Sequence, residues 1–205
     1  MNRILMTAVV ATALAASLPS RAAEDASRSA AELMDIVMWG REPVGGPFAL
    51  VDQHGRPRTD ADFRGSLMLV YFGYTYCPDI CPADLLSMGQ AIDLLGPAGD
   101  AVQPLFVTVD PERDTSAHLA EYVPLFHPRL IGLTGSPEAI GRAAAAYKVY
   151  FRKDGQGDRG SYSVDHSAFI YLMDRDGGYL GFVPPGTPPD RLAAAIRPHL
   201  PMRGR

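Results

Sequence analysis

Uninterrupted apolar runs mark the two strongest predicted strands of this chain. Residues 67–72 read Leu-Met-Leu-Val-Tyr-Phe, and a second apolar run spans residues 104–109. A strand that is apolar at every position is typical of a sheet covered on both faces. Shorter strands are predicted over residues 48–51, 130–133, 168–173 and 179–183. The last two flank an Asp-Arg-Asp-Gly-Gly turn, which indicates an antiparallel hairpin.

Helical patterns separate these strands. Pro82 can occupy the first turn of a helix over residues 83–95, which should end at the following Gly-Pro pair. Further helices are expected over residues 116–126, 137–147 and 189–199, with Ser136 as the N-cap of the middle one. Strand-helix-strand units followed by a hairpin and a helix predict an α/β fold with a central mixed sheet flanked by helices.

A lead-in segment over residues 23–45 precedes the predicted domain. Its apolar residues recur at a spacing that predicts a short amphipathic helix lying on the domain. They are Leu33, Met34, Ile36, Val37, Met38 and Trp39. Met34 and Met38 stand four residues apart and could be taken for a metal-loading tail. Because this is also ordinary helix-face spacing, we interpret both methionines as packing residues.

The first 22 residues have the pattern of a secretory signal peptide. Arg3 precedes an uncharged apolar stretch over residues 4–18, and small residues, Ser20 and Ala22, stand before the expected cleavage point. An uncleaved membrane anchor is the alternative, but a spanning helix needs roughly 20 apolar residues and this run is shorter. We therefore expect an exported, periplasmic protein that is soluble after cleavage, with a domain over residues 46–200 and a tail over residues 201–205.

Composition and charge describe one ordinary globular domain. The 205 residues are 47% hydrophobic and 20% charged, with a formal net charge of −4. These values are typical of a single packed domain. The 19 basic and 23 acidic residues are scattered without a basic run, so the chain lacks the electrostatic footprint of a nucleic-acid-binding protein. We therefore exclude nucleic acid as a partner.

The chain has two cysteines, Cys77 and Cys81, and they are separated by three residues. A disulfide that closes so small a loop removes little entropy from the unfolded chain, and a domain of this size has enough core without one. The pair follows the first buried strand, at the sheet edge where α/β proteins place their sites. If Cys81 enters the next helix, both sulfurs lie on one face and the helix amides favour thiolates. Two thiolates can form a redox pair or a soft-metal site.

A histidine helps to choose between these chemistries. His166 precedes the strand predicted over residues 168–173, at what we expect to be the same edge of the sheet. Two thiolates and one imidazole suit Cu(I), which accepts soft ligands and low coordination numbers, whereas zinc normally takes a fourth ligand. A lone histidine is more often bonded locally, so it is the cysteine pair that favours a ligand role for His166.

Three motifs in this order resemble the Sco (SenC/PrrC) family of copper chaperones. They are Tyr71 to Pro82 (YFGYTYCPDICP), Thr108 to Thr115 (TVDPERDT) and Asp165-His166-Ser167. The similarity runs from about Gly46 to Leu200. It implies a thioredoxin-like fold and delivery of copper, as Cu(I) or Cu(II), to the dinuclear CuA centre of a cytochrome c oxidase subunit.

The same resemblance implies roles for individual residues and partners. Cys77, Cys81 and His166 would be the copper ligands, and Asp110 would lie near the site. A periplasmic copper donor and a thiol reductant are further expected partners. Both cysteines must be reduced before copper can bind, because a disulfide would remove two ligands. Protons compete with metal for all three ligands, so binding should weaken as the pH falls.

Enzymatic activity is the principal alternative. A thiol-disulfide oxidoreductase would use Cys77 and Cys81 as catalytic residues on the cysteines of the CuA site or of other exported proteins. Such enzymes usually have two residues between their cysteines and a cis-proline facing them. This chain has three residues there, and no proline stands between Pro137 and Pro184. A histidine occupies the corresponding region, which favours metal binding.

Two weaker alternatives and one question remain open. A thiol peroxidase would need an arginine beside its cysteine, but we expect the nearest candidate, Arg113, to pair with Asp110 or Asp114. A purely structural module would bind no ligand at all. Tyr74 and Tyr76 could form a docking rim beside the cysteines or pack under their loop, and the sequence favours neither.

Overall fold

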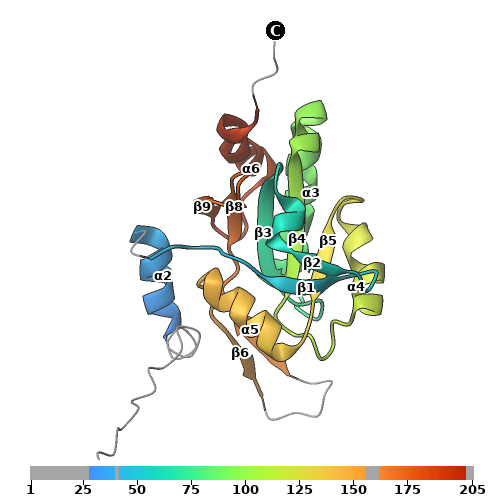
Figure 1. Cartoon of the computed structure of the whole chain (residues 1–205), viewed down its shortest axis with the longest axis vertical. Helices are drawn as coiled ribbons and strands as arrows, with labels where there is room; N and C mark the ends of the chain where they lie inside the picture. Colours follow the sequence, from blue (N-terminus) through green and yellow to red (C-terminus); the bar gives the residue numbers. More distant parts are fainter. Residues whose placement is uncertain (1–27, 40–41, 156–161, 202–205) are drawn as a thin grey trace, which may run out of the picture.

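A seven-stranded mixed sheet forms the centre of the computed structural model (Figure 1). Its strands are β1 (Ala49–Asp52), β2 (Pro57–Thr59), β3 (Leu67–Gly73), β4 (Val102–Thr108), β5 (Ile131–Thr134), β8 (Ile170–Met173) and β9 (Tyr179–Val183). They lie in the order β2-β1-β5-β4-β3-β8-β9. β3, β4 and β5 are parallel, whereas β1 and β8 run antiparallel to their neighbours. The structure describes residues 28–39, 42–155 and 162–201.

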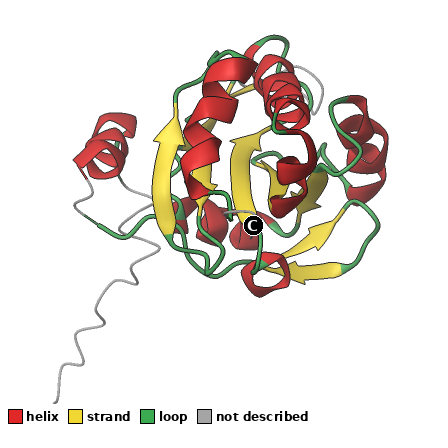
Figure 2. Ribbon diagram, turned by 90° about the horizontal axis from the view of Figure 1, so that it is seen from above, coloured by secondary structure: helices red, strands yellow, loops and turns green. Residues whose placement is uncertain are grey.

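Helices cover both faces of this sheet, as expected (Figure 2). They are α2 (Ala30–Trp39), α3 (Ile80–Leu94), α4 (Ser116–Tyr122), α5 (Pro137–Ala146) and α6 (Pro189–Ile196). Consecutive side chains of a strand point to opposite faces. Tyr71 of β3 lies on the same side as Cys81 of α3, since a Cβ on Gly73 would meet both side chains. Phe72 packs instead against Tyr147, directly after α5, with ring centroids 5.3 Å apart.

Several helix ends differ from the expected ones. α3 begins at Ile80, three residues before its predicted start, which places Cys81 in its first turn. The helices predicted over residues 116–126 and 189–199 both finish as short 3-10 segments, Val123–Leu125 and Arg197–His199. Each of these segments contains a proline, which lacks the N–H that would continue the α-helical hydrogen bonding.

A second, two-stranded sheet was not predicted from the sequence. It pairs β6 (Phe151–Asp154) antiparallel with β7 (Ser163–His166), and residues 156–161 between them lie outside the described residues. Most side chains of these two strands are exposed, so the segment lacks the apolar periodicity from which strands are predicted. This β6–β7 hairpin carries His166 at the end of β7.

The lead-in segment forms the predicted amphipathic helix, α2. Leu33, Ile36 and Val37 are buried, but Met34 and Met38 are 38% and 53% exposed. The prediction that the two methionines are packing residues is therefore wrong. Their four-residue spacing does place them on one helix face, but the buried stripe of α2 needs only the other three apolar side chains.

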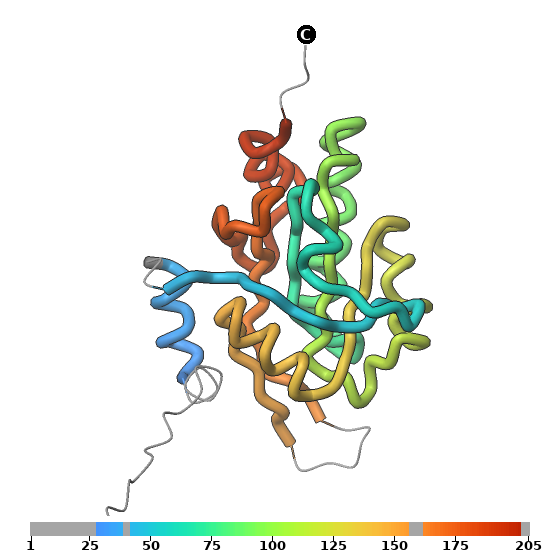
Figure 3. Tube along the Cα trace, viewed as in Figure 1, coloured from blue at the N-terminus to red at the C-terminus, as the bar shows by residue number. Residues whose placement is uncertain are grey.

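The chain after α2 joins this helix to the domain. It passes beside α5, where the N–H of Gly45 donates a hydrogen bond to the carbonyl oxygen of Ala146 at 2.9 Å (Figure 3). Within the described part of the chain, no helix is both long enough and apolar enough to cross a membrane. The signal peptide predicted over residues 1–22 lies outside the described residues.

Two helical glycines give a test of this packing. A Cβ on Gly89 of α3 would lie 2.5 Å from the carbonyl oxygen of Phe126, whereas a Cβ on Gly141 of α5 would meet nothing within 4 Å. Gly89→Ala should therefore lower the free energy of unfolding by about 1–3 kcal/mol, because backbone must move. Gly141→Ala should raise it by about 0.5–1 kcal/mol, because alanine loses less entropy in a helix. Urea unfolding of both variants measures this, and equal stabilities would contradict the packing of α3.

Candidate metal centre

The two cysteines meet at the N-terminus of α3. Cys77 lies in the loop after β3. The Sγ of Cys77 accepts a hydrogen bond from the N–H of Cys81 at 3.5 Å. The N-cap residue, Asp79, makes no side-chain capping bond, so the sulfur of Cys77 accepts from one of the free amides at the helix start. Cys77 is 8% exposed and Cys81 is 0% exposed. Neither forms a disulfide.

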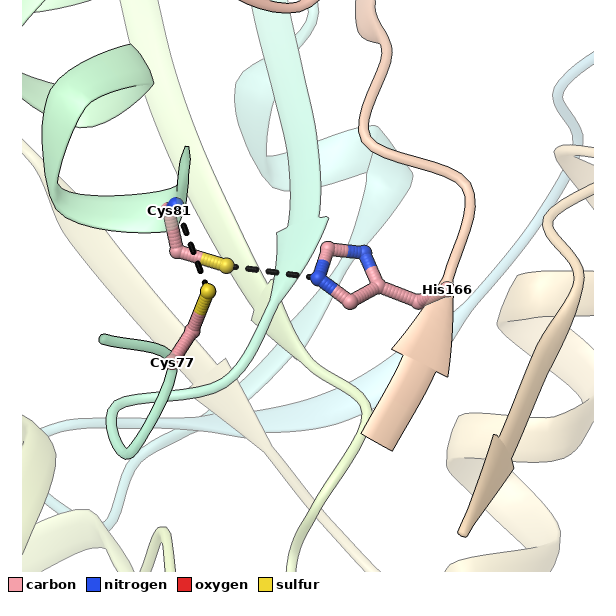
Figure 4. Close-up of side chains that lie close together, drawn as sticks. All are labelled: Cys77, Cys81 and His166. Atoms are coloured by element: carbon pink, nitrogen blue, oxygen red, sulfur yellow. Dashed lines mark hydrogen bonds between the residues drawn. The ribbon is translucent and has the colours of Figure 1, made fainter. Parts of the chain in front are cut away.

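His166 reaches this pair from the β6–β7 hairpin (Figure 4). Its Nε2 lies 3.3 Å from Sγ of Cys81, and its Nδ1 lies 3.3 Å from the carbonyl oxygen of Ser167. The ligand atoms of Cys77, Cys81 and His166 all lie within 4.8 Å of one another. Over residues 28–39, 42–155 and 162–201, this is the one cluster of three or more His, Cys, Asp or Glu side chains with that spacing.

Aromatic rings enclose the imidazole. Tyr74 and Tyr71 both meet the His166 ring edge-on, with centroids 5.7 and 6.5 Å away, and both tyrosines are buried. Tyr76 is 53% exposed and stacks on His118. Of the two tyrosines for which the sequence favoured neither role, Tyr74 is therefore a packing residue, and the docking role of the exposed Tyr76 stays a prediction.

The cysteines form a coupled pair that differs in protonation. The thiol of Cys81 donates to the sulfur of Cys77, and this bond, with further help from His166 and backbone N–H groups, lowers the pKa of Cys77 to about 3. The same bond, together with burial, raises the pKa of Cys81. The metal-free pair therefore holds one thiolate, on Cys77, and one thiol, on Cys81. Such a pair can attack a disulfide, or bind a soft metal once Cys81 loses its proton.

A buried carboxyl group holds the start of the cysteine loop. Asp114 accepts hydrogen bonds from the N–H and Oγ1 of Thr75, at 3.0 and 2.6 Å, and from Oγ1 of Thr108 at 2.7 Å. Burial raises the pKa of Asp114. Nε2 of His118 lies 2.8 Å from the same Thr75 hydroxyl. Sequence reasoning missed this cluster, although Asp114 follows a buried strand that ends at this sheet edge.

Asp110, which was expected near the site, is completely buried, and its carboxyl group bonds to residues other than the cysteines and His166. Its carboxyl group accepts from Nε of Arg113 and, at 2.6 Å, from the hydroxyl of Tyr162. The expected pairing of Arg113 with Asp110 is thereby confirmed. Asp110 therefore contacts the residue that precedes β7, and its hydrogen bonds do not go to the sulfurs or to His166.

Another buried carboxyl group lies one turn after Cys81, and the sequence did not single it out. Asp84 is 0% exposed, and burial raises its pKa. Its Oδ1 accepts from the N–H of Gly186 at 2.8 Å, in the turn before α6. The contact attaches the second turn of α3 to the turn before α6, a helix that lies beside α3.

The unequal protonation of the cysteines can be measured without a metal. At about pH 6, where an ordinary cysteine with a pKa of about 8.5 is protonated, the reduced protein should show the ultraviolet absorbance of one thiolate. Cys77→Ser should abolish this signal, and Cys81→Ala should move it to higher pH because the side-chain donor to Cys77 is lost. Thiolate absorbance that develops only above about pH 8 in the unsubstituted protein would contradict the assignment.

Comparison with known proteins places this site in a family. The SCO1/SenC family model matches residues 38–200. The mitochondrial SCO2 homolog of Bos taurus is 41% identical over 203 residues, which cover 97% of this chain and 75% of that protein. Protein sco1 of Schizosaccharomyces pombe is 44% identical over 160 residues, which cover 77% of this chain. The matched part is 61% of the length of the S. pombe protein.

Solved structures agree with this result. Bradyrhizobium japonicum ScoI with copper bound is 42% identical, with a TM-score of 0.68 over 77% of this chain and 99% of that one. Yeast Sco1 with copper bound is 38% identical, with a TM-score of 0.72 over 77% of this chain and 88% of that one. The predicted thioredoxin-like fold is confirmed. The chain is therefore a member of the SCO1/SenC family.

Proposed function

We propose that this protein is a periplasmic copper chaperone, which binds copper through Cys77, Cys81 and His166 and delivers it to the CuA site of a cytochrome c oxidase subunit. One observation carries the proposal, namely that two sulfurs and one imidazole nitrogen lie within 4.8 Å of one another. These are soft and borderline donors, which suit Cu(I) at low coordination number. The copper-bound structures of B. japonicum ScoI and yeast Sco1 support the choice of metal.

Recipient and location rest on other observations. The Sco family is linked to the assembly of cytochrome c oxidase, which supports an oxidase subunit as the recipient. The signal-peptide pattern of residues 1–22 supports export. A copper donor in the same compartment completes the proposed route, with residues 46–200 as the domain that carries the metal.

The protonation states suggest how the ligands act. Cys77 already holds a thiolate that can meet an incoming Cu(I), and Cys81 must release its proton before it becomes the second sulfur ligand. His166 supplies the third donor from the opposite side of the site (Figure 4). A disulfide between the cysteines would remove both sulfur ligands, so a thiol reductant must return two electrons before loading.

A thiol-disulfide oxidoreductase is the second candidate, and the protonation of the pair favours it. A thiolate on Cys77 beside a thiol on Cys81 is the arrangement of an attacking and a resolving cysteine. In that role the imidazole, 3.3 Å from the Cys81 sulfur, would serve only to stabilise the Cys77 thiolate, whereas in copper binding it would itself be a ligand. Copper transfer uses all three side chains, and we therefore prefer it.

Anaerobic titration of the reduced protein with Cu(I), against a chromophoric competitor, tests the metal site. One equivalent should bind, and either Cys77→Ser or Cys81→Ser should abolish competitive binding. His166→Ala should weaken it by roughly tenfold or more, since even residues outside the ligand shell contribute about that much. His199→Ala, at an exposed histidine near the C-terminus, is the matched control and should change nothing. Failure of the unsubstituted protein to compete would refute the chaperone function and leave the oxidoreductase.

Copper affinity should also depend on pH in a defined way. Because Cys77 is already ionised and Cys81 is not, binding near neutral pH should release about one proton, from Cys81. The Cu(I) association constant should then rise about tenfold per pH unit between about pH 6 and pH 8. Calorimetry in buffers of different ionisation enthalpy counts this proton. An association constant that does not change with pH would show that both sulfurs are ionised before the metal arrives.

A further inference from the structure

His166 belongs to a part of the fold that the central sheet does not hold. The β6–β7 hairpin is a separate two-stranded sheet, and an isolated hairpin of this kind is at best marginally stable in water. Yet Nε2 of His166 must stay beside the Cys81 sulfur, which belongs to α3. Contacts between the hairpin and the rest of the domain therefore decide where the third ligand lies.

At the His166 end, a local pair of bonds fixes the chain. Ser167 donates its N–H to the carbonyl oxygen of Tyr150 at 2.9 Å, and the N–H of Tyr150 donates to Oγ of Ser167 at 3.2 Å. Both residues belong to the hairpin or its immediate flanks. These bonds hold the two strands together at this end, but they do not attach the hairpin to the cysteine side of the molecule.

At the other end, three residues form what we call the Tyr162 clamp, namely Asp110, Arg113 and Tyr162. The Tyr162 hydroxyl donates to Oδ1 of Asp110 at 2.6 Å, and Nη1 of Arg113 donates to the carbonyl oxygen of Tyr162 at 3.0 Å. The guanidinium of Arg113 also lies over the Tyr162 ring, 3.7 Å from its centroid, and pairs with Asp110. The Asp110 carboxyl group is completely buried, and the Arg113 side chain is only 8% exposed.

Low exposure makes this contact stronger than an ordinary surface pair. The hairpin has a second ionic contact with the domain, between Lys153 and Glu112 at 2.8 Å, but those side chains are 43% and 54% exposed. Exposed ion pairs contribute little to stability, with a median of about 0–1 kcal/mol. A buried, charge-assisted hydrogen bond is stronger and more directional. The Tyr162 clamp is therefore the stronger of these two ionic contacts, and it acts together with Val164 of β7, whose side chain is buried in the core.

The clamp and the ligand lie on the same face of one extended segment. Tyr162, Val164 and His166 are buried or half-buried, whereas Ser163 and Asp165 are exposed, as a strand with one inward face requires. Four residues of strand separate the two ends by about 13 Å. The segment is thus fixed near Asp110 at its start and meets the cysteines at its end.

We propose that Asp110 and Arg113 serve metal binding through Tyr162, by fixing the start of β7 so that His166 is held at bonding distance from the cysteine sulfurs. If β7 shifted by one residue, the imidazole would turn to solvent. A shift of β7 by two residues would move the imidazole by about 7 Å along the strand. Each shift would break the Tyr162 hydroxyl bond. The three clamp residues are positioning residues, and the proposal rests on His166 being a ligand, as proposed above.

Tyr162→Phe tests this role, because it removes one hydroxyl and keeps the ring beneath Arg113. In the metal-free protein, the amides of β7 should exchange with deuterium faster, and the NMR signals of the His166 imidazole should shift. Cu(I) affinity should fall by roughly tenfold, as for other residues that orient ligands. Tyr179→Phe, at a half-buried tyrosine of β9, is the matched control and should leave all three measurements unchanged.

A double-mutant cycle separates positioning from general destabilisation. In the His166→Ala background, Tyr162→Phe should cause no further loss of Cu(I) affinity, because the group that it positions is gone. Asp110→Asn, which removes the ion pair but keeps an acceptor oxygen, should show the same dependence on His166. A roughly tenfold loss in both backgrounds would overturn the proposal, since the clamp would then act through the cysteine loop. An unchanged affinity in the single variant would overturn it too.

Failure of the proposed function can be distinguished from failure of the clamp. If the unsubstituted protein does not bind Cu(I), the chaperone function is refuted, but the metal-free measurements still decide the clamp. Faster exchange in β7 and a shifted His166 imidazole in Tyr162→Phe, and not in Tyr179→Phe, would support the positioning role. Identical β7 exchange in both variants would overturn it.

Discussion

Three side chains from three separate segments must meet within 4.8 Å, and much of the fold serves this one constraint. Cys77 comes from a loop, Cys81 from the first turn of α3, and His166 from the end of β7. The sulfurs share one proton and are buried, so burial that would otherwise disfavour a thiolate must be offset locally. The Cys81 thiol, the Cys81 N–H and the imidazole provide that stabilisation.

Each segment is held by a different kind of interaction. Cys81 is fixed by helix geometry, because α3 packs on the sheet and the turn after Cys81 is attached to Gly186 through Asp84. The loop that carries Cys77 is held through Thr75, which bonds to the buried carboxyl group of Asp114 in the loop between β4 and α4. The β6–β7 hairpin has the smallest share of the core, and it depends on buried polar bonds at the residue that precedes β7.

This division explains how much could be predicted from the sequence. The strand before the cysteines was predictable, because a strand buried on both faces is apolar at every position. The meeting of the cysteines was predictable too, since a helix that begins between two residues four positions apart can bring their side chains together. The β6–β7 hairpin and Tyr162 were not, because a mostly exposed hairpin has no apolar period and its partners stand about 50 residues away in sequence. The prediction that Met34 and Met38 are packing residues failed for the opposite reason. The helix periodicity was correct, but periodicity does not say which face of the helix is buried.

The exposure of the ligands constrains how any partner engages the site. Cys81 is completely buried and Cys77 is 8% exposed, so a thiolate or a disulfide that approaches from solvent meets the Cys77 sulfur first. In the alternative oxidoreductase, Cys77 would therefore be the attacking residue and Cys81 the resolving one. In the proposed copper transfer, the more exposed Cys77 would be the ligand that an acceptor replaces first, while Cys81 and His166 would still hold the ion. The same asymmetry would serve both chemistries, and metal transfer is the one in which the imidazole would act as a ligand rather than only as a partner of the thiolate.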